Sequence, residues 1–184
     1  VEHKDMQEYL ESKAKLFSLC KIGVLNRDDP NFTGILQNHT CHVKTYGLEQ
    51  PADLQGSNCR HFSKPGFLGI AFEVSGEESF TAEVDIPGRF NAYNALAAIG
   101  ACHELGIPAE AMKQGLSTVK VKGRVEPVPV PGNYTVLLDY AHNGVGMENI
   151  LTTLREYQPK RLICLFGAGG NRPKVRRYEM GEVA

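Results

Sequence analysis

The sequence lacks an excess of charge of one sign. Its 184 residues carry 20 Lys and Arg against 21 Asp and Glu, so the formal net charge is −1. A strong positive excess is the electrostatic footprint of proteins that bind nucleic acid or an anionic membrane surface. We therefore expect neither nucleic acid nor a membrane among the partners.

Long hydrophobic runs and paired cysteines are also missing. The longest apolar runs span only a handful of residues, whereas a membrane-spanning helix needs about 20. The chain does not open with the basic and apolar segments of a secretory signal. Its five cysteines are scattered and form no C-x-x-C pattern, which is typical of reduced thiols. These features favour a cytoplasmic protein.

What is present is the composition of an ordinary globular protein, with 42% hydrophobic and 22% charged residues. A chain of this length can form one domain, or two small ones with real cores. The first residue is Val rather than Met, and the last residues, "RRYEMGEVA", look like an interrupted helix. These ends suggest a fragment of a longer protein.

The first two thirds of the sequence predict helices around a small sheet. Residues 5–20 have apolar side chains at helical spacing, and Asp5 is placed to cap the helix. Three alternating segments rich in β-branched and aromatic residues predict a small antiparallel sheet. Two further helices follow, the first stopped by Gly106 and the second with Pro108 near its start. The predicted ranges are a strand at 21–26, sheet segments at 41–48, 66–74 and 79–88, and helices at 89–106 and 107–119.

The pattern changes after residue 120. Residues 120–134 contain three prolines and two glycines, which predict a hinge leading into an edge strand. The remainder alternates strand, helix, strand, glycine loop and helix, which predicts a βαβ unit with a parallel sheet. The expected elements are strands at 134–141 and 160–167 and helices at 146–157 and 174–184.

Polar residues follow both strands of this predicted unit. Ligands bind at the carboxyl ends of the strands in open α/β sheets. Asp139 can accept the two hydroxyl hydrogen bonds that a ribose offers, and His142 and Asn143 can donate to a phosphate. A glycine loop at 167–170 precedes a helix N-terminus, where anions are favoured, and basic residues follow it. The plain alternative is that Asp139 only caps a helix and that the basic residues form a solvated face.

Histidines and cysteines between residues 39 and 61 raise a second possibility, a zinc site. Their spacing matches no standard zinc pattern, and alternate residues of a strand point to opposite faces. The sequence therefore argues against zinc binding by these five residues, which are His39, Cys41, His42, Cys59 and His61.

Four motifs in order carry a resemblance to a known family. They are "GRFNAYNALAA", "GRVEP", "DYAHN" and "FGAGGNR…RRYEMG". As a set, they resemble the Mur ligases, which are ATP-dependent amide ligases of peptidoglycan assembly. The likeness is strongest to the MurE type, the UDP-N-acetylmuramoyl-dipeptide ligases that add the third amino acid. It extends from "MQEYLESKAKLF" to the last residue.

The resemblance implies an α/β fold built from parts of two domains. Residues 1–120 would be the C-terminal part of the central ATP-binding domain, with helices and a small antiparallel sheet. Residues 121–184 would be the N-terminal part of the Rossmann-like C-terminal domain, which brings the incoming amino acid. The family's P-loop, of the type G-x-x-G-K-[ST], does not occur in the 184 residues. The fragment alone is therefore expected to be inactive.

The resemblance also implies roles for residues of the first part and the hinge. Lys13 would be carbamylated and help to hold magnesium, and the plain alternative is that Lys13 and Lys15 are solvated helix charges. Asn91 and Asn94 would lie near the adenine, since an amide offers both a donor and an acceptor. Their alternative role is to cap the helix that begins there. Arg124 would face the γ-phosphate, where a guanidinium stabilises charge on a transferring phosphoryl group.

In the last part, the resemblance implies that Asp139 and Tyr140 contact the nucleotide, with Asp139 on the ribose. His142 would lie near the phosphates, and Lys174 would contact a phosphate. Arg172 would hold the carboxylate of the incoming amino acid, for which a bidentate guanidinium is suited.

The implied reaction consumes ATP with magnesium as cofactor. ATP phosphorylates the terminal carboxylate of a UDP-N-acetylmuramoyl-peptide, and the amine of the incoming amino acid, diaminopimelate or lysine, displaces the phosphate. The sequence departs from the family at "NRP", where Asp-Arg-Asp is common. "DYAHN" is also similar to cyanophycin and folylpolyglutamate synthetases. A related ligase of that kind and a non-catalytic Mur-like module remain the alternatives.

Overall fold

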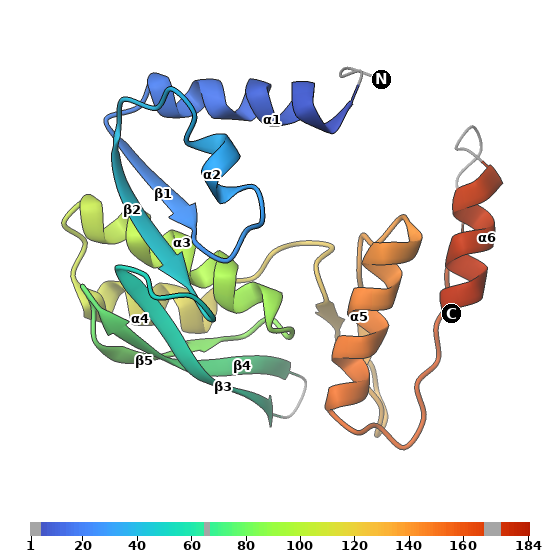
Figure 1. Cartoon of the computed structure of the whole chain (residues 1–184). Coiled ribbons are helices and arrows are strands. Elements are labelled where there is room, and N and C mark those ends of the chain that lie inside the picture. Colours follow the sequence, from blue (N-terminus) through green and yellow to red (C-terminus); the bar gives the residue numbers. More distant parts are fainter. Residues whose placement is uncertain (1–4, 65–66, 168–173) are drawn as a thin grey trace.

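The computed structural model describes residues 5–64, 67–167 and 174–184, and it divides into two lobes joined by a hinge segment (Figure 1). We call residues 5–119 the first lobe, residues 120–125 the hinge segment and residues 126–184 the second lobe. The first lobe contains α1 (Met6–Ala14), the 3-10 helix η1 (Lys15–Ser18), β1 (Ile22–Asn26), α2 (Phe32–Ile35), β2 (His42–Gly47), β3 (Leu54–Lys64), β4 (Phe67–Gly76), β5 (Phe80–Val84), α3 (Phe90–Glu104) and α4 (Ala109–Thr118).

The first lobe is built on one mixed sheet in the order β1-β2-β3-β4-β5. β2 pairs in parallel with both β1 and β3, whereas β3–β4 and β4–β5 are antiparallel. The expectation of a purely antiparallel sheet is therefore wrong for residues 42–47. The sequence analysis also missed β3, whose register shifts between Ser57 and Arg60. Asn58 has a φ of 51° there, and such a bulge interrupts the alternation by which strands are predicted.

The core of the first lobe lies where α3 and α4 cover the sheet. α3 packs on β1, β2 and β3, and α4 packs on β5. Gly100 allows α3 to approach β1 closely, because a Cβ at that position would lie 2.8 Å from Val24. The predicted helices are confirmed, with Asp5 accepting a hydrogen bond from the Glu8 amide at 2.8 Å and Gly106 in a left-handed conformation after α3.

The second lobe contains β6 (Glu126–Val128), β7 (Val136–Leu138), α5 (Gly144–Glu156) and α6 (Lys174–Val183). β6 and β7 pair antiparallel, which confirms the expected edge strand after the hinge. α5 and α6 pack against each other through Met147, Leu151 and Met180. Among the described residues, no helix is long and apolar enough to span a membrane.

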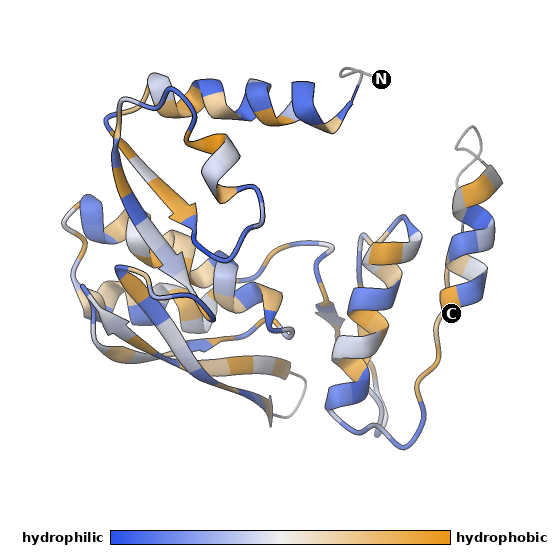
Figure 2. Ribbon diagram, viewed as in Figure 1, coloured by the Kyte–Doolittle hydropathy of each residue, from blue (hydrophilic) through white to orange (hydrophobic). Residues whose placement is uncertain are grey.

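The predicted parallel strand at 160–167 is not formed, so the expected βαβ unit is wrong for the described chain. Figure 2 shows hydrophobic residues along the segment between α5 and α6, yet Ile163 is 72% and Leu165 99% exposed. A strand needs a neighbour for its backbone groups, and parallel strands need cover on both faces. β7 has three residues and, among the described strands, pairs with β6 alone, so residues 160–167 have no strand beside them.

Candidate functional site

A cavity of about 440 Å³ lies between the start of α3, the hinge segment and α5. Its volume is within the range of small-molecule sites. Four residues that the sequence analysis selected, Asn91, Asn94, Arg124 and Asp139, line it together. The complete lining consists of Ile86, Phe90, Asn91, Asn94, Val121, Arg124, Val125, Asp139, Ala141, Gly146, Asn149 and Ile150.

The two asparagines of α3 have different surroundings. Asn91 is buried and donates from Nδ2 to the Pro87 carbonyl oxygen at 2.8 Å, while its Oδ1 accepts from Asn94 Nδ2 at 3.0 Å. Neither side chain caps the helix, whose N-cap is Arg89 without a side-chain hydrogen bond. Asn94 is exposed, and its amide oxygen makes no hydrogen bond with the described residues. Asn91 thus fixes the start of α3, and Asn94 offers an acceptor to the cavity.

A carboxylate of the first lobe supports the start of α3. Asp28 accepts hydrogen bonds from the backbone amides of Leu48, Glu49 and Gln50 at 2.7–3.0 Å and from the Tyr93 hydroxyl at 3.0 Å. Burial opposes ionisation of Asp28, but these hydrogen bonds outweigh it and lower its pKa. Burial and the bond to Asp28 raise the pKa of Tyr93 to about 12. Because Tyr93 lies between Asn91 and Asn94, this network holds the site's helix against loop 47–50.

Asp139 lies just after β7 and is bound through both carboxylate oxygens. Oδ1 accepts from the Ala141 amide at 2.7 Å, and Oδ2 accepts from the Val125 amide at 3.0 Å. The capping residue of α5 is Asn143, which accepts from the Gly146 amide at 2.7 Å. The alternative that Asp139 is merely a helix cap is therefore wrong.

Arg124, Tyr140 and His142 form an exposed group beside the cavity. The Arg124 guanidinium carbon lies 5.7 Å from the centre of the Tyr140 ring, which favours a cation–π contact. The ring centres of Tyr140 and His142 are 5.3 Å apart. Among these three residues, only Arg124 lines the cavity itself. The group leaves a guanidinium and an imidazole at the cavity's edge, where they can meet an anion.

The remaining predicted residues are not brought to this cavity. Lys13 is exposed on α1, with Nζ 5.3 Å from the centre of the Tyr9 ring, and lines a separate pocket of about 300 Å³. Among the described residues, Asp29 is the one carboxylate that lines that pocket. Magnesium takes several oxygen ligands, so these described residues do not make up a magnesium site around Lys13. Arg172 lies outside the described residues, and Lys174 is described only as the first residue of α6.

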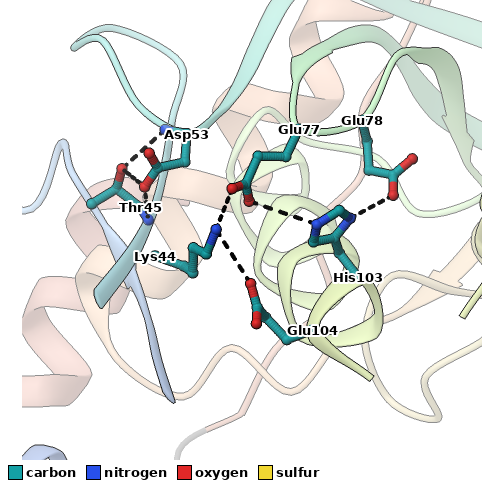
Figure 3. A network of polar contacts seen from close by, with 7 residues as sticks. All are labelled: Lys44, Thr45, Asp53, Glu77, Glu78, His103 and Glu104. Carbon is teal, nitrogen blue, oxygen red and sulfur yellow. Dashed lines mark hydrogen bonds and ion pairs between the residues drawn. The ribbon is translucent and has the colours of Figure 1, made fainter. Parts of the chain in front are cut away.

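Among the described residues, one group combines three potential metal ligands, Glu77, His103 and Glu104. The Lys44 ammonium lies between its two carboxylates, bonded to Glu77 and 3.5 Å from Glu104 (Figure 3). The hydrogen bond to Glu77 is the main cause that raises the pKa of Lys44. His103 Nδ1 is 2.6 Å from Glu78. The network therefore places the Lys44 ammonium where the two carboxylates could hold a metal ion, and it joins β2 and the β4–β5 turn to the end of α3.

Among the described residues, contacts of Tyr157 and Glu156 with the first lobe also join the lobes beyond the cavity, and sequence reasoning missed them. The Tyr157 hydroxyl donates to the Gly69 carbonyl oxygen at 2.6 Å, and His61 Nε2 lies 2.9 Å from Glu156. The rings of His61 and Tyr157 also meet edge to face, 5.0 Å apart. The sequence does show a tyrosine at the end of the predicted helix 146–157. That position does not reveal its hydrogen-bond partner, Gly69, which lies 88 residues away in the chain.

Comparison with known proteins identifies both lobes. A family model described as the Mur ligase middle domain matches residues 2–102, and one described as the glutamate ligase domain of Mur ligases matches residues 123–184. The chain belongs to the Mur ligase family. This confirms the family that the motifs indicated, and the α/β fold class is confirmed with it.

Individual Mur ligases align along nearly the whole chain. The UDP-N-acetylmuramoyl-L-alanyl-D-glutamate–2,6-diaminopimelate ligase of Caldanaerobacter subterraneus subsp. tengcongensis is 39% identical over 184 residues, which are 99% of this chain and 37% of that protein. The ligase of the same name from Clostridium botulinum is 39% identical over 98% of this chain and 38% of its own length.

A solved structure of a ligase with this name superposes with a TM-score of 0.74 at 26% identity, covering 100% of this chain and 39% of that one. The chain therefore spans less than two fifths of the length of these Mur ligases. The activity of those complete proteins is therefore only proposed for this chain.

Proposed function

We propose that the chain forms the adenosine-binding part of an ATP-dependent amide ligase. This ligase adds an amino acid to UDP-N-acetylmuramoyl-L-alanyl-D-glutamate in peptidoglycan synthesis. The observation that carries the proposal is the single cavity between the lobes that Asn94, Arg124 and Asp139 line together. These three groups offer an amide, a guanidinium and a carboxylate, which suit a purine edge, phosphate oxygens and ribose hydroxyls.

The nucleoside would be held by residues from both lobes. Asn94 lies on α3 and has an amide oxygen free of hydrogen bonds to the described residues, which can accept from an exocyclic amine. Asn91 orients it through the 3.0 Å hydrogen bond between the two amides. Asp139 would accept from the ribose hydroxyls, and Tyr140 lies next to it in the chain. Residues 1–120 and 121–184 then correspond to parts of the central and C-terminal domains.

The phosphates would extend toward the cationic side of the site. Arg124 is placed to stabilise charge on the transferred phosphoryl group, because a guanidinium stays protonated throughout the reaction. His142 and Lys174 would contact phosphate oxygens. Lys13, once carbamylated, would contribute to magnesium binding, which supplies charge neutralisation to the phosphates. That role requires further oxygen ligands, which the described residues around Lys13 do not provide.

The reaction then joins two substrates with the expenditure of ATP. The terminal carboxylate of the nucleotide-linked dipeptide takes the γ-phosphoryl group and releases ADP. The amine of the incoming amino acid attacks the resulting acyl phosphate, and phosphate leaves. Arg172 would hold the carboxylate of this amino acid. We assign diaminopimelate, because the similar ligases from two bacteria carry it in their names. A cytoplasmic location follows from these substrates.

Activity of the complete gene product tests the proposal. With ATP, magnesium, UDP-N-acetylmuramoyl-L-alanyl-D-glutamate and diaminopimelate, we expect phosphate release together with a tripeptide product detected by mass. Arg124→Ala should lower the rate by about a hundredfold or more. The matched control is Arg155→Ala, which removes an exposed arginine at the end of α5.

Three outcomes decide the proposal. Equal rates for Arg124→Ala and Arg155→Ala would remove Arg124 from catalysis. Product formation with lysine in place of diaminopimelate would show that the assignment of diaminopimelate is wrong. The proposed ligase activity would still stand. No phosphate release that depends on the nucleotide-linked dipeptide would overturn the function. Residues 1–184 expressed alone should not hydrolyse ATP, because no P-loop sequence occurs in them.

A further inference from the structure

Cys20 and Cys41 stand at the starts of two neighbouring strands. Cys20 lies between η1 and β1, and Cys41 immediately precedes β2. The parallel ladder of these strands begins with the pair Ile22 and His42, and the His42 amide donates to the Lys21 carbonyl oxygen at 2.9 Å. The chain just before β1 and the chain just before β2 therefore run side by side, which brings the two cysteines together from distant parts of the sequence.

The backbone before β2 is held against the end of η1. The amides of Thr40 and Cys41 both donate to the Phe17 carbonyl oxygen, at 3.1 and 3.3 Å. The Thr40 hydroxyl donates to the Ser18 carbonyl oxygen at 3.1 Å. The Cys41 sulfur also lies against β1, because a Cβ added at Gly23 would be only 3.0 Å from it. Several contacts thus fix Cys41 beside the part of the chain that leads into β1.

The two thiols are themselves neighbours. Burial raises the pKa of Cys41, and the adjacent Cys20 thiol adds to this rise. Cys41 is 7% exposed, whereas Cys20 is only partly buried. A disulfide needs two Cα atoms about 4.4–6.8 Å apart, and neighbouring strands lie about 4.8 Å apart. The two cysteines therefore have the proximity for a disulfide, and one of them is open to a reagent in solvent.

We propose that Cys20 and Cys41 are a redox-active pair, which hydrogen peroxide or another peroxide converts into a reversible disulfide. The inference does not depend on the proposed function. Cys20 is the residue that meets the peroxide, because its side chain is the more exposed of the pair. Cys41 is the residue that completes the disulfide, because its sulfur is buried beside Cys20.

The reaction proceeds in two balanced steps. The Cys20 thiol loses its proton, and the thiolate attacks one oxygen of hydrogen peroxide. The O–O bond breaks to leave a sulfenic acid and hydroxide, and the hydroxide takes up the proton that the thiol lost. The Cys41 sulfur then attacks the sulfenic sulfur, the S–O bond breaks, and water leaves. The two thiols are oxidised, and the peroxide is reduced to water. A dithiol such as dithiothreitol reverses the change by thiol–disulfide exchange.

The disulfide would enclose β1 and α2 in a covalent loop and fasten the chain after η1 to the start of β2. Because α1 continues directly into η1, the disulfide also restrains the helix that carries Lys13. A crosslink of this kind restricts the unfolded chain, so the oxidised protein should unfold about 5–10 °C above the reduced protein.

Mass spectrometry of residues 1–184 tests the pair directly. The chain is treated with a small excess of hydrogen peroxide, then denatured, alkylated with iodoacetamide and digested. We expect a pair of peptides joined through Cys20 and Cys41, at the summed mass of the two peptides less two hydrogen atoms. Cys59 and Cys102 should be alkylated in the same sample. Dithiothreitol added before alkylation should restore the alkylation of Cys20 and Cys41, and thermal unfolding is measured on both forms.

Single variants separate the two roles. Cys41→Ser should leave a sulfenic acid at Cys20, which dimedone traps, because the partner thiol is gone. Cys20→Ser should leave Cys41 fully alkylated after denaturation, because the buried thiol does not meet the peroxide. The matched control is Cys102→Ser, which removes another partly buried cysteine and should keep both the disulfide and the rise in unfolding temperature.

Three results would contradict the inference. The first is oxidation of the exposed Cys164 while Cys20 and Cys41 both remain open to alkylation. The second is a disulfide that joins Cys20 to a different cysteine or to a second copy of the chain. The third is an equal unfolding temperature for the oxidised and the reduced protein, since the disulfide would then restrain nothing.

Discussion

The two lobes differ in how much of their apolar surface they bury. In the first lobe, the core formed by the sheet, α3 and α4 includes Phe72, Leu96 and Ile99, each at most 1% exposed. In the second lobe, the core of the described residues consists of Met147, Leu151 and Met180, and Leu165 stays 99% exposed. Buried apolar area is the main stabilising contribution in folding. We therefore expect the first lobe to be the more stable of the two.

This difference divides the candidate site. Asn91 and Asn94 lie on α3, which packs on three strands of the first lobe. Asp139 and Arg124 lie in the second lobe and the hinge, where few apolar side chains are buried. Besides the hinge segment, the Tyr157–Gly69 and His61–Glu156 contacts connect the second lobe to the first. A site shared between a firm lobe and a lightly packed one can change shape when the lightly packed lobe moves.

The largest effect is expected in the core of the first lobe. Phe72→Ala should lower the free energy of unfolding by about 3–5 kcal/mol, because it removes a fully buried ring and leaves a cavity. Leu151→Ala, in the smaller core of α5 and α6, should cost about 2 kcal/mol. Urea unfolding followed by amide exchange in each lobe measures both. Equal effects of the two substitutions would show that the lobes are equally well packed.

The next effect concerns the carboxylate that supports α3. Asp28→Ala leaves three backbone amides of loop 47–50 without their acceptor, at a cost of about 2 kcal/mol. The pKa of Asp28 is lowered in the folded protein, so its contribution is present above the unfolded pKa of about 4 and is lost as the pH falls through the folded pKa. Unfolding at pH 7 and below pH 3 should show the difference between Asp28→Asn and the unaltered chain shrinking at low pH. A constant difference would contradict this role.

A smaller effect is expected at the contact between the lobes. Tyr157→Phe removes the hydrogen bond to the Gly69 carbonyl and should cost about 1 kcal/mol. Burial raises the pKa of Tyr157, so its contribution is complete below the unfolded pKa of about 10 and is lost as the pH rises further. Unfolding at pH 7 and pH 11 checks the sign, with Tyr134→Phe, an exposed tyrosine, as control. If Tyr157→Phe speeds amide exchange in the second lobe and not in the first, the contact stabilises the second lobe.

The smallest effect on stability is expected at Lys13. Its side chain is exposed on α1, so Lys13→Ala should change the free energy of unfolding by less than about 0.5 kcal/mol. In the complete gene product, the same substitution should lower ligase activity, with partial rescue by small carboxylates. Lys15→Ala, two residues further along, is the control for both measurements. Activity equal to that of Lys15→Ala would remove Lys13 from the site.

Much of the first lobe and part of the site could be predicted from sequence. Local signals sufficed for Asp5 as a helix cap and for Gly106 as a helix stop. The motifs around Asn94, Arg124 and Asp139 led to one cavity, although their chemical roles stay predictions.

What could not be predicted depends on contacts distant in the chain. Residues 160–167 have the apolar character of a strand, but a strand forms only beside a partner. β3 escaped notice because its bulge breaks the alternation. The hydrogen bonds of Asp28 join residues that are 20 to 65 positions apart in the sequence. Nothing in the letters "GRVEP" indicates that Val125 is left-handed or that its amide donates to Asp139, 14 residues further along the chain.

The most direct test of the account is a crystal structure of residues 1–184 with ADP bound. We predict the nucleoside in the cavity between α3, the hinge segment and α5, with its base within hydrogen-bonding distance of Asn94 and its ribose hydroxyls on Asp139. ADP bound only in the pocket beside Lys13, or outside the cavity between the lobes, would contradict the account.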